Sequence, residues 1–359
     1  MSPEGTPRGR PARVRRTCAL AAGILAVALA AAGCGSSGSG SGSTGSTGDS
    51  GGSSSKQANI AMFIVDTSNT HQQAALTGAQ TAARELGNAT VRPFGAAFDP
   101  NKQVNQIEDA IATGQYNVFI VDAVDGTVVV PAIRQALAKG IKVVCGFSVC
   151  GPDQTRFANE IPGIVSQVST DYYTVGGYGG VAAARACAGK NPCKVVYLDG
   201  TPTLAADVSF TRGWKAEVAK HPNMQVVAVG QGQFLADPAF KAMKDILQTH
   251  PNVDVVGSVS DQEIVGAAQA VKEAGKAGKI ALIGDGASAE AVRGIEAGVW
   301  YGSTVLRPYN QGYLAAKYGI GALRGQSAPP LVNSDESTLV PEGYISRATV
   351  SKWKAEWPG

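Results

Sequence analysis

The residues best suited to chemistry lie directly after short β-branched runs of the sequence. They combine carboxylates, amides and a hydroxyl with one arginine and two aromatic rings, and they are Asn69, Gln72, Asp122, Phe147, Ser148, Asp199, Phe234, Asp261, Asp285 and Arg307. A carboxylate or amide accepts a hydrogen bond from a hydroxyl group, an arginine donates one, and an aromatic face covers C–H groups. Sites for small molecules are built from such groups. The mixture predicts a site for a neutral, polyhydroxylated ligand.

Several of these residues also have a purely structural interpretation. Asp261 and Asp285 each open a helical segment, where a side-chain carboxylate caps free backbone N–H groups. Phe147 could fill the space between packed elements instead of stacking on a ligand. Arg307 stands before a proline, where it could pair with an acid. A capping role together with ligand contact is our expectation for the two aspartates.

Catalysis and metal binding are not expected. The sequence has no G-x-S-x-G motif, and its three histidines, His71, His221 and His250, are scattered. His71 is expected to be a solvated loop residue, and Asp122 and Asp199 are expected to be loop or capping residues. We therefore predict a binding protein without a cofactor or metal, and an extracytoplasmic enzyme remains as an alternative.

Alternating strands and helices must position these residues. The β-branched runs predict strands at 60–65, 118–121, 143–145, 195–198, 226–229, 253–259, 280–283 and 303–306. Amphipathic segments predict helices at 72–86, 104–113, 128–139, 211–220, 238–249, 264–274 and 311–323. Apolar strands between helices indicate parallel sheets covered on both faces. Because the pattern occurs twice, we predict an α/β protein with two Rossmann-like lobes and a ligand beyond the carboxyl ends of the strands.

The first 55 residues indicate export. Five arginines precede the apolar run 18–32, which ends at Gly33-Cys34, and this order is typical of a signal peptide at 1–33. The run is about 15 residues long, shorter than the roughly 20 that span a membrane as a helix. The sequence Ala31-Ala32-Gly33-Cys34 resembles the lipobox of bacterial lipoproteins, which implies lipidation of Cys34. A Gly/Ser-rich tether is predicted at 34–56, because this composition cannot form a core.

Charge gives no support for nucleic-acid binding. The whole chain has 31 Lys and Arg against 28 Asp and Glu, a net charge of +3. Five of the basic residues and one acidic residue belong to the predicted signal peptide, which leaves 26 basic and 27 acidic residues, or −1. We therefore expect no nucleic-acid partner.

Four cysteines remain beyond the export region: Cys145, Cys150, Cys187 and Cys193. In an oxidising compartment they are expected to form disulfides. Pairing of neighbours in sequence, Cys145 with Cys150 and Cys187 with Cys193, is our prediction, although three connectivities are possible. Zinc is the alternative, but no histidine lies near either pair and neither spacing is C-x-x-C.

Several short segments between 57 and 351 together resemble one known family. They include Ala83-Arg84-Glu85-Leu86-Gly87, Gln106-Ile107-Glu108-Asp109-Ala110-Ile111, Thr170-Asp171, Arg212-Gly213-Trp214, Gly266-Ala267-Ala268-Gln269-Ala270 and Ile283-Gly284-Asp285-Gly286. Their order and spacing are similar to those of type I periplasmic binding proteins, in the ribose-binding-like branch that serves ABC sugar transporters. The resemblance implies an extracytoplasmic, membrane-anchored and monomeric binding lipoprotein that delivers a solute to a permease.

The resemblance also implies an organisation and a site. It places an N-terminal lobe at 57–169 with 308–338, a C-terminal lobe at 170–307 with 339–359, and hinge crossovers near 168–171, 306–309 and 337–341. Matched residue by residue, the ligand-binding positions are Asn69, Gln72, Phe147, Ser148, Phe234, Asp261 and Asp285, to which we add Arg307. The implied ligand is a monosaccharide or polyol, held as the hinge closes.

The chain departs from its relatives at positions that touch the ligand. The first loop has His71, Gln72 and Gln73 where sugar binders commonly have aromatic residues that stack on the ring. Phe147-Ser148 stands where an Asp-Arg pair is common, and Leu306-Arg307 stands where an amide is common. A non-sugar ligand, such as a signalling furanone, a nucleoside or a small acid, is therefore the alternative, for a sensor or a transport component.

Overall fold

The computed structural model describes residues 55–335 and 340–359. The predicted signal peptide, almost all of the tether and the proposed lipidation site at Cys34 lie outside the described residues. Within the described residues, no helix combines the length and the apolar character needed to cross a membrane.

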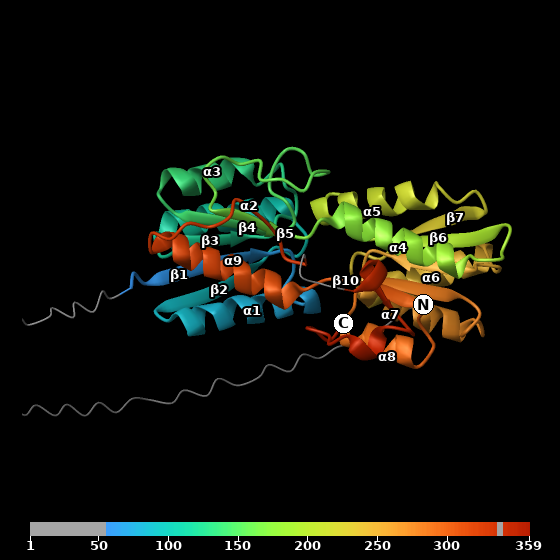
Figure 1. Cartoon of the computed structure of the whole chain (residues 1–359). Helices are drawn as coiled ribbons and strands as arrows, with labels where there is room; N and C mark the ends of the chain where they lie inside the picture. The colour runs from blue at the N-terminus through green and yellow to red at the C-terminus, as the bar shows by residue number, and fades with distance from the viewer. Residues whose placement is uncertain (1–54, 336–339) are drawn as a thin grey trace, which may run out of the picture. The chain divides into compact units, whose positions relative to one another are not determined.

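Two six-stranded sheets form the framework of the described chain (Figure 1). The first has the order β11-β5-β4-β3-β1-β2, with β1 (Ala58–Ile64), β2 (Ala89–Gly95), β3 (Val118–Val121), β4 (Lys142–Phe147), β5 (Ser166–Ser169) and β11 (Leu331–Asn333). The second has the order β12-β10-β9-β8-β6-β7, with β6 (Cys193–Asp199), β7 (Met224–Gln231), β8 (Val255–Ser258), β9 (Ala281–Gly286), β10 (Gly302–Val305) and β12 (Tyr344–Ser346). All pairings are parallel except that of β12 with β10.

Helices cover both faces of each sheet (Figure 1). In the first lobe, one face packs against α1 (Thr70–Leu86) and α9 (Pro308–Leu323), and the other packs against α2 (Pro100–Thr113) and α3 (Val130–Ala138). In the second lobe, one face packs against α4 (Tyr172–Ala186) and α5 (Ala205–Val218), and the other packs against α6 (Ala236–Thr249), α7 (Asp261–Glu273) and α8 (Ala289–Glu296). The predicted α/β class with two Rossmann-like lobes is confirmed.

The chain passes between the lobes between β5 and α4, between β10 and α9, and between β11 and β12. The first two crossovers fall where the sequence predicts them. The third was expected near 337–341, and residues 337–339 of that stretch lie outside the described residues. Neither lobe is one continuous stretch: the first is completed by α9 and β11 after the second crossing, and the second is completed by β12 after the third.

The boundaries differ from the predicted ones mainly where polar residues begin a helix. The helix expected from 104 begins at Pro100, because its first turn, which Asp99 caps, is polar and shows no apolar periodicity. The helix expected from 211 begins at Ala205, after Leu204, which makes no side-chain capping hydrogen bond. Strand β2 was missed, since it lies at the sheet edge and contains Pro93, which counts against a strand in a sequence pattern.

Glycines allow neighbouring helices to approach to backbone contact. A Cβ atom added at Gly213 in α5 would lie 1.9 Å from the carbonyl oxygen of Tyr173 in α4, and one at Gly176 in α4 would lie 2.0 Å from that of Phe210 in α5. Each glycine therefore packs against the backbone of the other helix, and only the lack of a side chain at both positions permits this spacing.

We predict that Gly213→Ala lowers the free energy of unfolding by about 2 kcal/mol or more, because the added methyl group must push two helices apart. Gly177→Ala on α4 is the matched control, since a Cβ there meets nothing within 4 Å; we expect it to stabilise the helix by about 1 kcal/mol. Urea unfolding of both variants measures the difference. Equal stability of Gly213→Ala and wild type would contradict the packing argument.

Candidate functional site

A cavity lies at the carboxyl ends of the strands and is lined by residues of both lobes. Six of the eight predicted ligand-binding residues line it: Asn69, Gln72, Phe147, Ser148, Phe234 and Asp285. The sequence order of strand ends brings them together, as the topology of open parallel sheets requires. Among the described residues, no group of three or more histidines, cysteines or carboxylates is placed to hold a metal.

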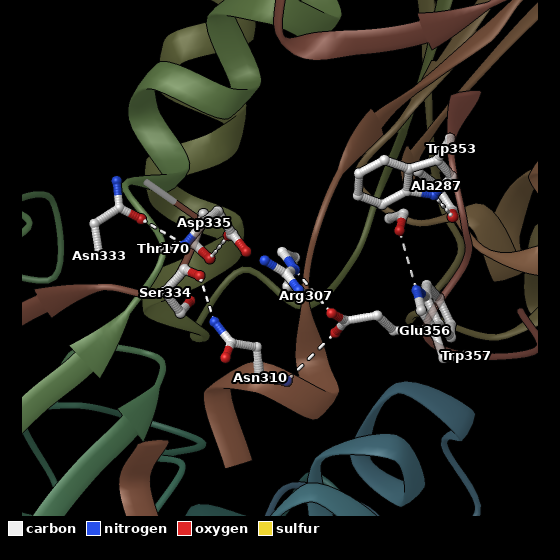
Figure 2. Close-up of polar contacts among 11 residues, drawn as sticks. Thr170, Ala287, Arg307, Asn310, Asn333, Ser334, Asp335, Trp353, Glu356 and Trp357 are labelled. Carbon is white, nitrogen blue, oxygen red and sulfur yellow. Dashed lines mark hydrogen bonds and ion pairs between the residues drawn. The ribbon is translucent and has the colours of Figure 1, made fainter. Parts of the chain in front are cut away.

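The other two predicted residues, Asp261 and Arg307, do not line the cavity. Asp261 accepts hydrogen bonds from the Ser303 hydroxyl (2.7 Å) and from the Ser288 backbone N–H (2.8 Å) within the second lobe. Arg307 Nε lies 2.8 Å from Glu356 Oε1, an ion pair at the second crossover (Figure 2). Ligand contact by these two residues stays a prediction.

The capping interpretation of the two aspartates was wrong. The cap of α7 is Ser260, whose hydroxyl accepts from the Gln262 backbone N–H, and the cap of α8 is Ser288, whose hydroxyl accepts from Ala291 N. Asp285 lies in β9 itself. In both helices, a serine just before the first turn provides the capping oxygen.

Seven further polar or aromatic residues line the cavity and are not among the eight predicted ligand-binding positions: His71, Phe98, Asp122, Tyr172, Ser260, Gln262 and Trp357. The expectation that His71 is a solvated loop residue was wrong, since it lies in the first turn of α1 and burial lowers the pKa of its imidazole to about 4. Asp122 could have been found, because it follows β3 at the same sheet edge as the other site residues. Trp357 could not, because no strand or motif precedes it.

Hydrogen bonds join three buried polar residues of the first lobe, Gln72, Asp122 and Ser148. Gln72 Nε2 donates to Asp122 Oδ2 (2.7 Å), and Ser148 N donates to Asp122 Oδ1 (3.2 Å). Burial raises the pKa of Asp122 to about 7 although both hydrogen bonds oppose it. Gln72 Oε1 has no hydrogen-bond partner among the described residues, and the side chain is only 5% exposed.

The two lobes meet through the first turns of α1 and α7. The side-chain amides of Asn69 and Gln262 lie 3.1 Å apart, and the Gln262 amide lies 2.7 Å from Thr70 Oγ1. Asn69 also caps α1, since its side chain accepts from the Gln72 backbone N–H. The same residues therefore begin the helices and join the lobes.

Two phenylalanines from equivalent loops line the cavity and stack on each other. Phe98 follows β2 and Phe234 follows β7, and their rings stack with centroids 6.3 Å apart and an interplanar angle of 3°. Both have φ of 57°, a left-handed conformation that a bulky residue adopts only under constraint. The constraint on Phe234 is Glu263, whose Oε1 accepts from the Phe234 backbone N–H (2.8 Å).

Asp285 contributes a second carboxyl to the cavity. The Thr304 hydroxyl donates to its Oδ1. Burial, and next the neighbouring charge of Asp261, hold the pKa of Asp285 well above its usual range. The described residues that line the cavity include no lysine or arginine. The site thus offers neutral or acidic hydrogen-bonding groups with aromatic faces, and no guanidinium or ammonium.

Both disulfides pair neighbours in sequence, as predicted: Cys145 with Cys150 and Cys187 with Cys193, with Cα–Cα distances of 6.0 and 5.6 Å. The first closes the loop that presents Phe147 and Ser148 to the cavity. The second joins the end of α4 to the start of β6, and neither of its cysteines lines the cavity. Zinc binding by these cysteines is not compatible with the bonds.

A family model described as a periplasmic binding protein domain matches residues 60–327. The D-apiose import binding protein of Paraburkholderia graminis is 28% identical to the chain over 239 residues, which are 66% of this chain and 72% of that protein. The ribose import binding protein of Bacillus subtilis is 23% identical over 283 residues, 78% of this chain and 87% of that protein. Both matches extend over most of the described chain.

Solved structures show the same fold. An ABC transporter solute binding protein from Mycobacterium smegmatis with bound glycerol is similar with a TM-score of 0.73 and 24% identity, over 85% of this chain and all of that one. The myo-inositol binding protein of Caulobacter has a TM-score of 0.69 and 20% identity, over 82% of this chain and 95% of that one.

The buried Glu263 carboxyl predicts a pH dependence of stability. Burial raises its pKa from 4.5 to about 8, so the folded protein keeps a proton that the unfolded chain releases near pH 4. The Glu263 carboxyl therefore makes its full contribution to the free energy of unfolding below about pH 4, and this contribution is lost as the pH rises towards 8. We expect Glu263→Gln, which stays neutral, to lose less stability than wild type between pH 5 and pH 8 in urea unfolding. An equal loss would contradict this role of Glu263.

Proposed function

The chain belongs to the type I periplasmic binding protein family, in its ribose-binding-like branch, and we propose that it captures a monosaccharide or polyol as the substrate-binding lipoprotein of an ABC importer. Members of this family are extracytoplasmic proteins that bind substrates for transport. The proposal concerns the ligand, the lipid anchor on Cys34 and the permease partner.

The observation that carries the proposal is the unpaired acceptor at Gln72. Gln72 lines the cavity, its Oε1 atom is buried without a hydrogen-bond partner among the described residues, and its Nε2 atom donates to Asp122. A buried acceptor without a partner costs about 1–3 kcal/mol, which a ligand hydroxyl that donates to it would recover. Asp122 and Asp285 add further acceptors to the same cavity. A ligand with several hydroxyl groups supplies the donors that these oxygens require.

The charge of the cavity favours a neutral ligand over a small acid. The lining side chains include Asp122 and Asp285, whose pKa values are raised by burial, and no cationic group among the described residues. An anionic ligand would be buried beside carboxyls without a counter-charge, which is strongly unfavourable. Relatives named for the neutral compounds D-apiose, ribose and xylitol support the same ligand class.

Ligand capture would proceed by hinge closure. We propose lobes of 57–169 with 308–338 and of 170–307 with 339–359, joined by the three crossovers. Because the cavity takes residues from both sheets, a bound ligand contacts both lobes only in the closed form and stabilises that form by its differential affinity. The closed monomer would then dock on the permease, and the lipid on Cys34 would keep it at the outer face of the membrane.

The proposal is tested by titration calorimetry of the exported protein against neutral sugars and polyols, with a furanone, a nucleoside and a small carboxylic acid as the comparison set. We expect saturable binding of at least one sugar or polyol and no conversion of it. Binding confined to the comparison set would reject the sugar proposal in favour of a sensor or transport protein for another solute. Turnover of any bound compound would indicate an enzyme.

The two disulfides offer a matched test of the cavity. The double variant Cys145→Ser/Cys150→Ser is expected to bind the sugar at least tenfold more weakly, because the loop carrying Phe147 and Ser148 loses its cross-link. Cys187→Ser/Cys193→Ser should lose comparable stability, about 2 kcal/mol for so short a loop, with little change in affinity. Calorimetry and thermal unfolding measure both effects. An equal loss of affinity in the two variants would contradict the proposed contact.

A further inference from the structure

We infer that Trp357 forms one wall of the ligand site and selects a ring-shaped ligand, a cyclic sugar or cyclitol, over an open-chain polyol. This inference rests on the proposed function, because it narrows the ligand class of the same cavity. Trp357 belongs to the C-terminal segment 354–359, which follows the last 3₁₀ turn and returns to the cavity.

Backbone hydrogen bonds hold the C-terminal segment against the second lobe. The carbonyl oxygens of Trp357 and Pro358 accept from Ala289 N and Glu290 N (both 2.9 Å), which are free N–H groups of the first turn of α8. The Trp357 indole donates from Nε1 to the carbonyl oxygen of Gly286 (3.0 Å). A Cβ atom at Gly286 would lie 2.4 Å from the indole, so the ring reaches this position only because residue 286 is glycine.

The same segment contacts the first lobe and the second crossover. Thr70 Oγ1 donates to the carbonyl oxygen of Gly359 (2.8 Å), and the ring of His71 meets that of Trp357 edge to face, with centroids 5.5 Å apart. Glu356 pairs with Arg307 and accepts from Asn310 N at the start of α9 (Figure 2). Trp357 is therefore held by contacts on both sides of the cavity and is not a free end.

The position of the Trp357 ring explains why the first loop can lack a large aromatic residue. His71, Gln72 and Gln73 provide no large aromatic face there, whereas Trp357 lines the cavity beside His71. The Trp357 side chain is 4% exposed and its only polar atom is already bonded to Gly286. What it offers a ligand is therefore an apolar aromatic face.

Such a face distinguishes ligands by shape. A six-membered ring with equatorial hydroxyls presents a fixed, flat set of axial C–H groups that packs on an indole. An open-chain polyol has rotatable bonds and no fixed face of this kind, so it must lose conformational entropy to present one. The polar oxygens of Gln72, Asp122 and Asp285 suit either ligand, which leaves Trp357 to discriminate between them.

Trp353, which directly precedes the C-terminal segment, provides a matched control. Its indole also donates to the loop after β9, to the carbonyl oxygen of Ala287 (2.8 Å), as Figure 2 shows beside Trp357. It packs against the core of the second lobe and does not line the cavity. A general effect of losing a tryptophan near this loop would appear in both variants, whereas a ligand contact would appear only at position 357.

The experiment compares wild type, Trp357→Ala, Trp357→Phe and Trp353→Ala by calorimetry, after thermal unfolding has shown that each is folded. The probes are D-glucose with D-glucitol, D-xylose with xylitol, myo-inositol, and one furanone and one nucleoside. Wild type should bind a ring compound more tightly than its open-chain partner. Trp357→Ala should weaken ring binding by about tenfold or more and remove this preference, Trp357→Phe should retain part of it, and Trp353→Ala should stay within about twofold of wild type.

Failure of this inference is distinguishable from failure of the proposed function. A wild type that binds sugar while Trp357→Ala binds it equally well, or a wild type that prefers the open-chain partner, overturns the role of Trp357 and leaves the proposed function intact. Binding of the furanone or nucleoside alone overturns the proposed function and the ring-sugar selection together, as does the absence of any binding. Equal weakening by Trp353→Ala and Trp357→Ala also overturns the assignment.

Discussion

The buried contact between the amides of Asn69 and Gln262 is the interaction on which the arrangement of the lobes depends. Each amide stands at the first turn of a helix that follows a parallel strand, so each is placed by its own lobe. Buried amides must be hydrogen-bonded, and each of these two is paired both within its own lobe and across the junction, since Asn69 accepts from Gln72 N, the Ser260 hydroxyl lies 3.3 Å from the Gln262 amide, and the two amides lie 3.1 Å apart. Hydrogen bonds between polar side chains therefore join the two lobes at the edge of the cavity.

Polar side chains at the crossovers between the lobes are hydrogen-bonded as well. The Gln311 amide donates to Thr170 Oγ1 (2.8 Å), the Thr170 hydroxyl donates to Asp335, and Asn310 Nδ2 donates to the carbonyl oxygen of Ser334 (2.8 Å). Figure 2 shows that the Thr170–Asp335 and Asn310–Ser334 contacts and the Arg307–Glu356 pair lie around one point where separate segments of the chain meet. Hydrogen bonds of this kind can be exchanged as the lobes rotate, whereas the apolar cores of the lobes remain packed.

Backbone strain is concentrated at the cavity. Phe98, Phe147 and Phe234 all have left-handed φ values, and all three rings line the cavity. Such conformations cost energy for bulky residues and persist only where surrounding contacts enforce them. Here Glu263 accepts from the backbone N–H of Phe234, the Cys145–Cys150 disulfide closes the loop at Phe147, and the rings of Phe98 and Phe234 stack on each other. The aromatic surface of the site is thereby placed in advance, which reduces the entropy that a ligand must pay on binding.

The sequence by itself determined the class of fold, the two lobes and six residues of the cavity. Strand periodicity is a local property, and the carboxyl ends of parallel strands meet wherever the sheet forms, so Asn69, Gln72, Phe147, Ser148, Phe234 and Asp285 were placed by strand order. The polar first turn of α2 and the edge strand β2 with Pro93 were missed, because neither shows apolar periodicity. The short strands β5, β11 and β12 and the helix α8 were not predicted either.

Only the tertiary structure decided which polar groups are already paired and which remain for a ligand. Asp261 and Arg307 have the right chemistry for a site, but their partners Ser303 and Glu356 lie 42 and 49 residues away in sequence. The Trp357 indole is held at the cavity by a hydrogen bond to Gly286 and by the ring of His71. Gly359, in the same C-terminal segment, accepts a hydrogen bond from Thr70. No spacing or periodicity records contacts between such distant segments, because they arise only when the whole chain has packed.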